Sequence, residues 1–208
     1  MRIKSPVALI SLLYIVSLTY ACTGVVKPYP DQRFYVLTAP RPAKPPQPVQ
    51  ASTLRIRKFR VSPRYETRSF LYQKSDSRYQ SDYYHKFLVS PGSIITEEVR
   101  RWLTESGLFQ YVTDVPGQIL TRYILEGVVT EIYGDFRQAD HPAAVLEIQL
   151  FLINRSGPNS KIVFQHKYKQ TIPLQDASPE ALVQGWNRAL ILILNEFEMY
   201  LGRQSLES

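Results

Sequence analysis

Cysteine is nearly absent from this sequence: the chain of 208 residues has one, Cys22. A single thiol excludes an internal disulfide, and no second cysteine or nearby histidine accompanies it as a zinc ligand would. Long apolar runs are also missing. Residues 7–18 and 189–194 are both shorter than the ~20 residues that a membrane-spanning helix requires. The sequence therefore predicts neither a disulfide-stabilised domain nor an integral membrane protein.

Motifs for catalysis are missing as well. There is no Gly-x-Ser-x-Gly elbow and no phosphate-binding glycine loop, and the three histidines are far apart in sequence. His166 lies on the apolar face of a predicted strand, where a hydrogen-bonded core histidine is the favoured interpretation. Glu97 and Glu98 are interpreted as partners of a helix dipole rather than as an acid/base pair. We therefore expect no catalytic residues, no metal and no cofactor, and a protein that is not an enzyme.

The N-terminal stretch has the features of an export signal. Arg2 and Lys4 precede the apolar residues 7–18, and the small residue Ala21 stands directly before Cys22. We interpret residues 1–21 as a lipoprotein signal peptide whose removal leaves an acylated Cys22. Several acyl chains would hold the mature protein at a membrane. The alternative is an ordinary secretory signal that happens to end at a cysteine.

The composition favours a folded, basic domain. The net charge is +7, and the 14 tyrosines help to bring the aromatic fraction to 12%, too high for a disordered chain. A basic surface suits anionic headgroups or acidic partners. It would also suit nucleic acid, but an exported protein rarely meets nucleic acid, so we expect no such partner.

The densest cationic run is a candidate interaction surface; it comprises Arg55, Arg57, Lys58, Arg60, Arg64 and Arg68. It is interpreted either as a solvated strand face or as a surface for lipid headgroups or an acidic partner. Tyrosines of the hairpin that follows suit an interface with one apolar and one wet side, although strand propensity explains them almost as well. The candidate residues are Arg55, Arg57, Lys58, Arg60, Tyr72, Tyr83 and Tyr84.

Residue patterns predict one α+β domain over residues 33–203, after a tether at 22–32 and before a frayed tail at 204–208. Strands are expected at residues 34–37, 54–61, 69–74, 78–87, 108–112, 123–133, 144–153 and 161–169, and a proline-rich surface loop at 40–50. One helix is expected between a Ser93 cap and Gly107, and another between Ser178 and Gly202. This order predicts a single mixed or antiparallel sheet with two helices packed on one face.

Taken in order, these features resemble the ABC-type transport auxiliary lipoproteins. The shared pattern is an acylated cysteine, a first short strand, a strand–proline segment, a tyrosine-rich hairpin, a helix running into residues 106–109, a long strand leading to residues 133–136, a closing hairpin and a C-terminal helix with Trp186. Gln73 and Phe87 depart from the arginine and tryptophan usual in this pattern.

The resemblance implies a non-enzymatic lipoprotein that works with an MCE-domain protein and an ABC permease to move lipids between two membranes. Thr23, which follows Cys22, implies the periplasmic face of the outer membrane, and a homo-oligomer is also expected. The alternative is an envelope lipoprotein that binds lipid or lipopolysaccharide in its own hydrophobic cavity, lined by Tyr72, Tyr83, Trp102 and Trp186. A hydrolase is disfavoured because no catalytic constellation is visible.

Overall fold

The computed structural model describes residues 31–43, 50–115, 121–156 and 159–203. The elements are β1 (Arg33–Tyr35), β2 (Gln50–Ile56), β3 (Arg60–Val61), the 3-10 turn η2 (Pro63–Tyr65), β4 (Ser69–Gln73), β5 (Tyr79–Phe87), α2 (Pro91–Ser106), β6 (Phe109–Thr113), β7 (Tyr123–Asp135), β8 (Ala143–Asn154), β9 (Lys161–Pro173) and α3 (Pro179–Arg203). All strands belong to one sheet of mixed orientation, which confirms the predicted α+β class.

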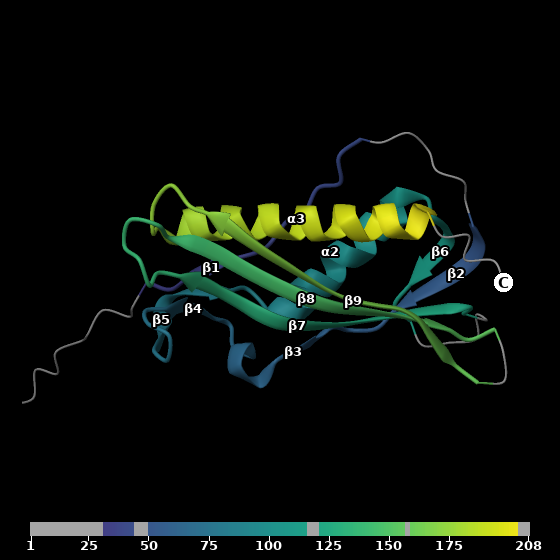
Figure 1. The fold of residues 1–208 in the computed structure, drawn as a ribbon, viewed down its shortest axis with the longest axis horizontal. Coiled ribbons are helices and arrows are strands. Elements are labelled where there is room, and N and C mark those ends of the chain that lie inside the picture. The colour runs from purple at the N-terminus through teal and green to yellow at the C-terminus, as the bar shows by residue number, and fades with distance from the viewer. Residues whose placement is uncertain (1–30, 44–49, 116–120, 157–158, 204–208) are drawn as a thin grey trace, which may run out of the picture. The chain divides into compact units, whose positions relative to one another are not determined.

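Strand β7 is the axis of the sheet. Along one of its sides β2, β3 and β4 pair with it in succession, all parallel. Along its other side β8 pairs antiparallel, and β9 then pairs antiparallel with β8. Strand β6 extends the sheet from β2, while β5 and β1 extend it from β4 (Figure 1). The two ends of β7 therefore carry different groups of short strands.

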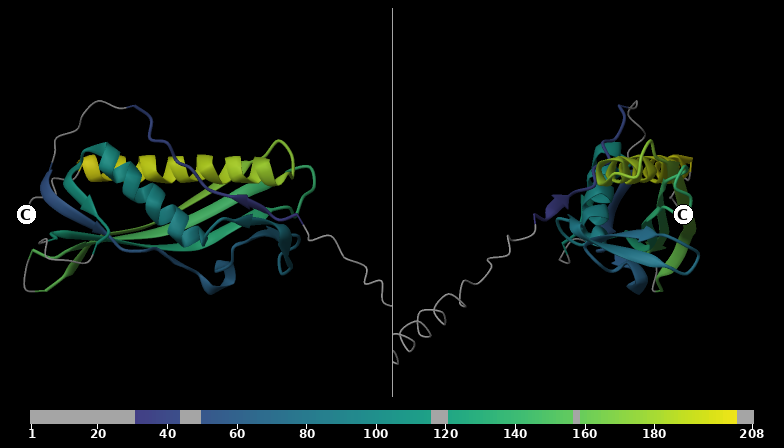
Figure 2. Two further views of the ribbon diagram at one scale, coloured as in Figure 1. Left: turned by 180° about the vertical axis from the view of Figure 1, so that it is seen from behind. Right: turned by 90° about the vertical axis from the view of Figure 1, so that its left-hand side faces the viewer.

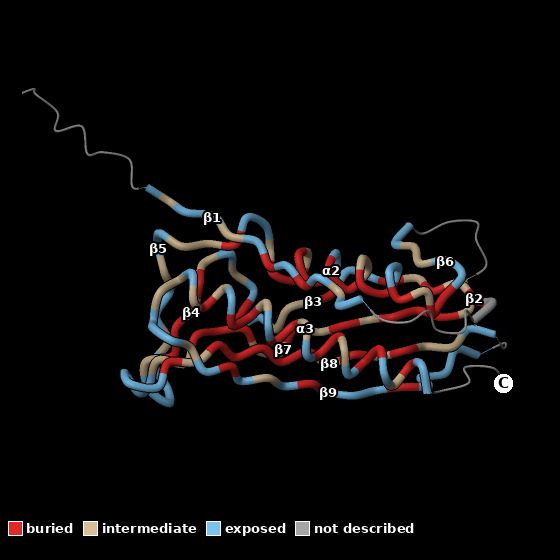
Figure 3. Tube along the Cα trace, turned by 90° about the horizontal axis from the view of Figure 1, so that it is seen from above, coloured by how far each residue is buried: buried red, intermediate tan, exposed pale blue. Residues whose placement is uncertain are grey.

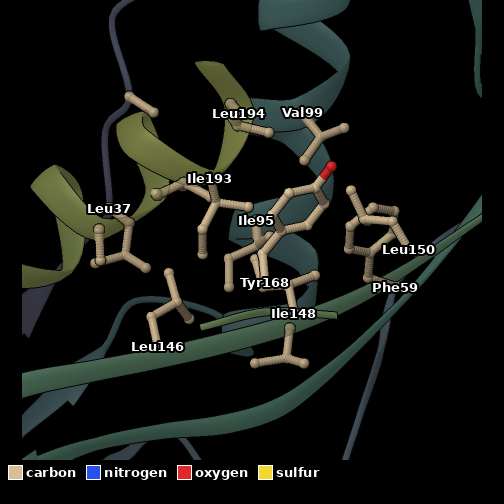
Figure 4. Packing of buried hydrophobic residues seen from close by; sticks show 14 of the residues in the cluster. Leu37, Phe59, Ile95, Val99, Leu146, Ile148, Leu150, Tyr168, Ile193 and Leu194 are labelled. Atoms are coloured by element: carbon tan, nitrogen blue, oxygen red, sulfur yellow. The ribbon is translucent and has the colours of Figure 1, made fainter. Parts of the chain in front are cut away.

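The helices cover one face of this sheet. Alternate residues of β8 point toward them, as predicted, and all are buried: Leu146, Ile148, Leu150 and Leu152. Figure 4 shows Leu146, Ile148 and Leu150 beneath side chains from both helices. The approach of α3 to β8 is close because Gly185 faces Ala144, where a Cβ added to the glycine would lie 2.6 Å from the Ala144 Cβ.

The structure corrects the predicted N-cap of α2 and confirms the predicted end of this helix. The cap is Ser90, not Ser93: the Ser90 hydroxyl accepts a hydrogen bond from the Ser93 amide at 3.3 Å. Pro91 then occupies the first turn, where its missing N–H costs nothing. Gly107 ends the helix in the left-handed conformation, with φ of 69°.

Helix α3 begins as predicted and ends later. The Ser178 hydroxyl accepts a hydrogen bond from the Ala181 amide at 3.2 Å. The predicted apolar stripe is buried along its whole length: Leu182, Trp186, Ala189, Leu190, Ile193, Phe197 and Leu201. Gly202 does not end the helix, which continues to Arg203, because a glycine stops a helix where its φ turns positive and, among described glycines, only Gly107 does so.

The predicted strand over residues 54–61 is split in two. Strand β2 ends at Ile56 and β3 begins at Arg60. Between them Phe59 is buried, and its ring lies so close to Gly127 of β7 that an added Cβ would fall 2.3 Å from it. The Phe59 amide donates to the Thr96 hydroxyl of α2 at 2.9 Å. The chain leaves the ladder because this ring fills the space between β7 and α2.

Residues 36–43, which we call the strap, run along the helices on the way from β1 to β2 (Figure 2). Leu37 and Ala39 are buried, and Leu37 joins the core cluster in Figure 4. The strap amides of Thr38 and Ala39 donate to side chains of α3 and α2, respectively. The strap is thus held by both helices. In residues 40–43, the described start of the predicted proline-rich surface loop, the Arg41 guanidinium donates to Glu198 of α3, and β2 already begins at Gln50.

Candidate interaction surfaces

The candidate residues named from sequence do not form one surface. Cys22 lies outside the described residues, so its acylation stays a prediction. Arg55 pairs in register with Ile124 at the start of β7, whereas Gln73, next to Tyr72, pairs with Asp135 at its end. At about 3.3 Å per strand residue these two positions are roughly 35 Å apart. The cationic residues therefore extend from the first end of β7 to its middle, where Arg60 pairs with Val128, and Tyr72 lies at its other end.

The cationic group, Arg55, Arg57, Lys58 and Arg60, is only partly solvated. Arg57 makes an ion pair with Glu126 of β7. Arg55 is half-buried, and its Nε atom is buried without a hydrogen-bond partner in the described part of the chain. Lys58 and Arg60 are exposed. The interpretation as a solvated strand face therefore fits Lys58 and Arg60, which are the residues of this group open to a partner.

The tyrosine group is organised by a bulge in β5. The register with β4 shifts between the Ser69–Lys86 pair and the Leu71–Ser81 pair. Asp82 holds the extra residues in place. Its Oδ1 accepts hydrogen bonds from the Tyr84 amide at 2.8 Å and from the His85 amide at 3.1 Å. A bulge of this kind re-aims the side chains that it contains.

The second oxygen of Asp82 joins β5 to β4. The Tyr72 hydroxyl donates to Oδ2 at 2.6 Å, and Nδ1 of His85 lies 2.8 Å from the same atom. Burial acts to raise the pKa of Asp82, but the hydrogen bonds from Tyr72, His85 and the Tyr84 amide outweigh it and lower that pKa below its usual range. Burial and then the bond to Asp82 raise the pKa of Tyr72 far above its ordinary value, so the phenol stays protonated. This Tyr–Asp–His group has a structural role: it joins β4 to β5, and its tyrosine is a hydrogen-bond donor and not a nucleophile.

The bulge presents two aromatic rings to solvent beside two cations. Tyr83 and Tyr84 are 57% and 52% exposed, and their rings meet edge to face at 5.4 Å. The Lys86 ammonium lies 5.1 Å from the centre of the Tyr83 ring. On β1, Phe34 pairs in register with Lys86 and lies under the Arg68 guanidinium at 5.4 Å. We call these five residues the β1–β5 patch; Figure 3 shows β1 and much of β5 as exposed.

Sequence reasoning found three of the five patch residues. Tyr83 and Tyr84 were named because tyrosines crowd the hairpin, and Arg68 as the last residue of the cationic run, but Phe34 and Lys86 were not. The parallel pairing of β1 with β5 brings Phe34 to Lys86, and the two segments are separated by the strap, three strands and the turn η2. The only sequence signal was the predicted short strand at residues 34–37, which gives no partner.

The four residues suggested to line a hydrophobic cavity do not share one environment. Trp102 and Trp186 are both 0% exposed and belong to the core. Their indole N–H groups donate to Glu198 and to the Val145 carbonyl. Tyr83 points to solvent on the bulge, so these residues do not line a common cavity.

A groove of about 750 Å³ lies between α3 and the outer strand β9. Its rings include Phe164 and Tyr200, whose centres are 4.3 Å apart, and His166 and Tyr168, 4.5 Å apart. His166 is exposed at this groove, so the interpretation as a core histidine is wrong. The reason is its position: β9 pairs only with β8, and α3 does not cover the whole of its helix-facing side.

Glu97 and Glu98 were predicted to interact with the dipole of α2, and the structure gives them a different role. Because α2 begins at Pro91, neither residue lies in its first turn. Glu97 pairs with Arg100 on the surface, and buried Glu98 pairs with Arg101 and accepts the Ala39 amide of the strap. The helix-dipole interpretation is therefore wrong, and Glu98 instead holds the strap.

Two further features bear on function. Within the described ranges no group of three or more histidine, cysteine or acidic side chains is placed to hold a metal ion. None of the helices found in those ranges has the length and apolar character needed to cross a membrane.

Comparison with known proteins gives a family and a fold. The model of the ABC-type transport auxiliary lipoprotein components matches residues 35–196. The structure is similar to the crystal structure of a protein from Xanthomonas campestris, with a TM-score of 0.73, 17% identity, and coverage of 85% of this chain and 100% of that one.

Two more solved structures share the fold. An uncharacterized protein has a TM-score of 0.61 at 12% identity and covers 80% of this chain and 99% of its own. A hypothetical protein from Chlamydia trachomatis has a TM-score of 0.51 at 9% identity, covering 73% and 98%. No curated protein matches the sequence.

Proposed function

The chain belongs to the family of ABC-type transport auxiliary lipoprotein components, and we propose that it is the membrane-anchored, non-enzymatic lipoprotein of an envelope lipid transport system. The observation that carries the proposal is the family match, which spans nearly the whole sheet and most of α3. In this proposal the domain docks on an MCE-domain protein and its ABC permease. The acylated Cys22 holds it at the periplasmic face of the outer membrane, as Thr23 suggests.

The arrangement of polar groups supports a docking role over catalysis. The candidate acid–base groups of the described chain are used to fasten the fold: Asp82 closes the β5 bulge, and Glu98 holds the strap. Lys58, between β2 and β3, and Arg60, on β3, are in contrast exposed. We assign these two cations to the contact with an acidic face of the partner.

The test is recovery of partners from native envelopes. The lipoprotein, solubilised in detergent, is purified with what it binds, and a Cys22→Ala chain is the control for anchoring. We expect an MCE-type protein or its permease with the native chain and much less with Cys22→Ala, because the anchor raises the local concentration. Recovery of lipid alone, or of an outer-membrane barrel alone, would contradict the proposal.

A charge-reversed variant tests the docking cations. Lys58→Glu with Arg60→Glu changes exposed residues and leaves the Arg57–Glu126 pair intact. We expect at least a several-fold loss of partner at low salt that shrinks as salt rises, since exposed charge contacts are screened. Recovery that is the same for both chains at every salt concentration would remove these residues from the interface.

A further inference from the structure

Exposed apolar side chains gather at one place on the domain. Among the described residues, twelve large hydrophobic side chains are exposed, and half of them lie on β1, β5 and the residues that directly follow these strands: Phe34, Val36, Tyr83, Tyr84, Leu88 and Val89. The β1–β5 register joins the two segments, and the Leu88 amide donates to the Tyr35 carbonyl at 2.8 Å. Contiguous exposed apolar surface of this kind marks an interaction site.

The charges around these side chains are cationic. Arg68 and Lys86 lie over the rings of Phe34 and Tyr83. Two neighbouring acids are engaged by other groups: Asp82 accepts hydrogen bonds within the bulge, and the exposed Glu180 accepts the Tyr35 hydroxyl at 2.7 Å. The patch thus offers aromatic rings and uncompensated cations together. Rings with a polar tip and long cationic side chains are suited to a lipid–water interface.

The covalent chain limits how far this patch lies from the anchor. Cys22 and Gln32 are ten residues apart in sequence. A fully extended chain of that length spans at most about 35 Å. Gln32 is next to the patch, because its side-chain amide donates to the Tyr83 carbonyl at 3.5 Å. An anchor at Cys22 would therefore keep the patch near the bilayer surface at a high effective concentration.

We propose that the β1–β5 patch is a membrane-contact surface, which binds the anionic phospholipid headgroups of the bilayer that holds the anchor. Phe34, Tyr83 and Tyr84 lie at headgroup depth, and Arg68 and Lys86 bind phosphate oxygens. The inference rests on the proposed lipid anchor at Cys22. A flexible tether alone leaves the domain free to rotate, whereas a second contact fixes its orientation. The part of the sheet that carries Lys58 and Arg60, beside the middle of β7, is then held away from the bilayer, toward the partner.

The experiment places a fluorescent probe in the patch. The lipidated full chain carrying Tyr84→Trp is reconstituted into vesicles of phosphatidylethanolamine and phosphatidylglycerol that contain brominated acyl chains, which quench indole emission on contact. A matched chain carrying Lys58→Trp places the probe at an exposed residue outside the patch, between β2 and β3 and beside the middle of β7. The native chain, whose Trp102 and Trp186 are buried, gives the background. Flotation of the vesicles reports separately on the anchor.

We expect all chains to float and the Tyr84→Trp emission to be quenched at least twofold more than the Lys58→Trp emission. Adding Lys86→Glu should reduce the extra quenching by more than half, while flotation is unchanged. Flotation with equal quenching of the two probes would overturn the proposal and leave the anchor intact. Failure to float would remove the anchor on which it rests. Quenching unaffected by Lys86→Glu, with the transport partner lost from the pull-down, would reassign the patch to a protein.

Discussion

Two sites in this molecule bring cations and aromatic rings together, one in the interior and one at the surface, and the two sites have different roles. In the interior, Glu198 accepts hydrogen bonds from the Arg41 guanidinium at 3.0 and 2.8 Å and from the Trp102 indole at 2.7 Å. We call these three residues the strap clamp. In the β1–β5 patch, by contrast, Arg68 and Lys86 lie on rings that face solvent, and no described carboxylate makes an ion pair with either cation.

The strap clamp and the β1–β5 patch differ in burial and in whether a carboxylate pairs with the cation. In the clamp, Glu198 and Trp102 are fully buried, and the bond to Glu198 raises the pKa of Arg41 further above its already high value. Removing one partner of a buried pair typically costs 3–5 kcal/mol, whereas exposed charge contacts contribute about 0–1 kcal/mol. The clamp therefore contributes to the stability of the fold, while the patch contributes little and is available for binding.

The largest effect is expected at the clamp. Glu198→Ala removes the acceptor of both Arg41 and Trp102 and leaves a buried guanidinium without its carboxylate. We expect the free energy of unfolding, measured in urea by circular dichroism, to fall by about 3–5 kcal/mol. The control is Glu97→Ala on α2, which removes an acid whose pair with Arg100 is exposed and should cost no more than about 0.5 kcal/mol. If the two variants lost equal amounts of unfolding free energy, the strap clamp would be no more important for stability than an exposed ion pair.

An intermediate effect is expected at Asp82, which lies between the two environments. Asp82→Asn keeps the size of the side chain but weakens its bonds to Tyr72, His85 and the two amides, which should cost about 1–2 kcal/mol at neutral pH. Urea denaturation measures the loss, and the Tyr72→Phe variant, which removes one of these bonds, should lose less.

The same residue gives a pH dependence. Because hydrogen bonds hold the pKa of Asp82 below its unfolded value of about 3.9, the carboxylate contributes fully to stability above that pH. Its contribution is lost as pH falls through the lower folded pKa. The difference in stability between native and Asp82→Asn chains should thus be constant from pH 5 to 7 and shrink below pH 4. A difference that grows on acidification would show that the carboxylate is not the group that holds the bulge.

Local patterns were sufficient to predict most of the fold. Alternation in β8 predicts its buried face, and helical spacing from Leu182 to Leu201 predicts the buried stripe of α3. Ser178 and Gly107 mark helix ends through chemistry that acts over a few residues. These features depend on neighbours in sequence, and for that reason the sequence shows them.

The features that depend on distant partners were not predictable. Pro40 and Pro42 exclude a helix but do not show that Arg41 reaches Glu198, which is 157 residues away. The β5 bulge depends on a register shift against β4 and on parallel pairing with β1. His166 follows the apolar alternation of its strand, and only the position of β9 at the outside of the sheet makes it exposed. The candidate residues fall on separate parts of the sheet for the same reason.

The smallest effect on stability is expected in the patch. Tyr83→Ser with Tyr84→Ser removes two rings that are more than half exposed and contact chiefly each other and Lys86. Surface substitutions of this kind change stability by about 0.5 kcal/mol or less, so the urea midpoint should stay close to that of the native chain. The extra bromolipid quenching, read from a probe at Phe34→Trp in the same double variant, should nevertheless fall by more than half. A stability loss as large as that of Asp82→Asn would mean that the rings are part of the fold, and the contrast between a structural clamp and a free binding surface would then fail.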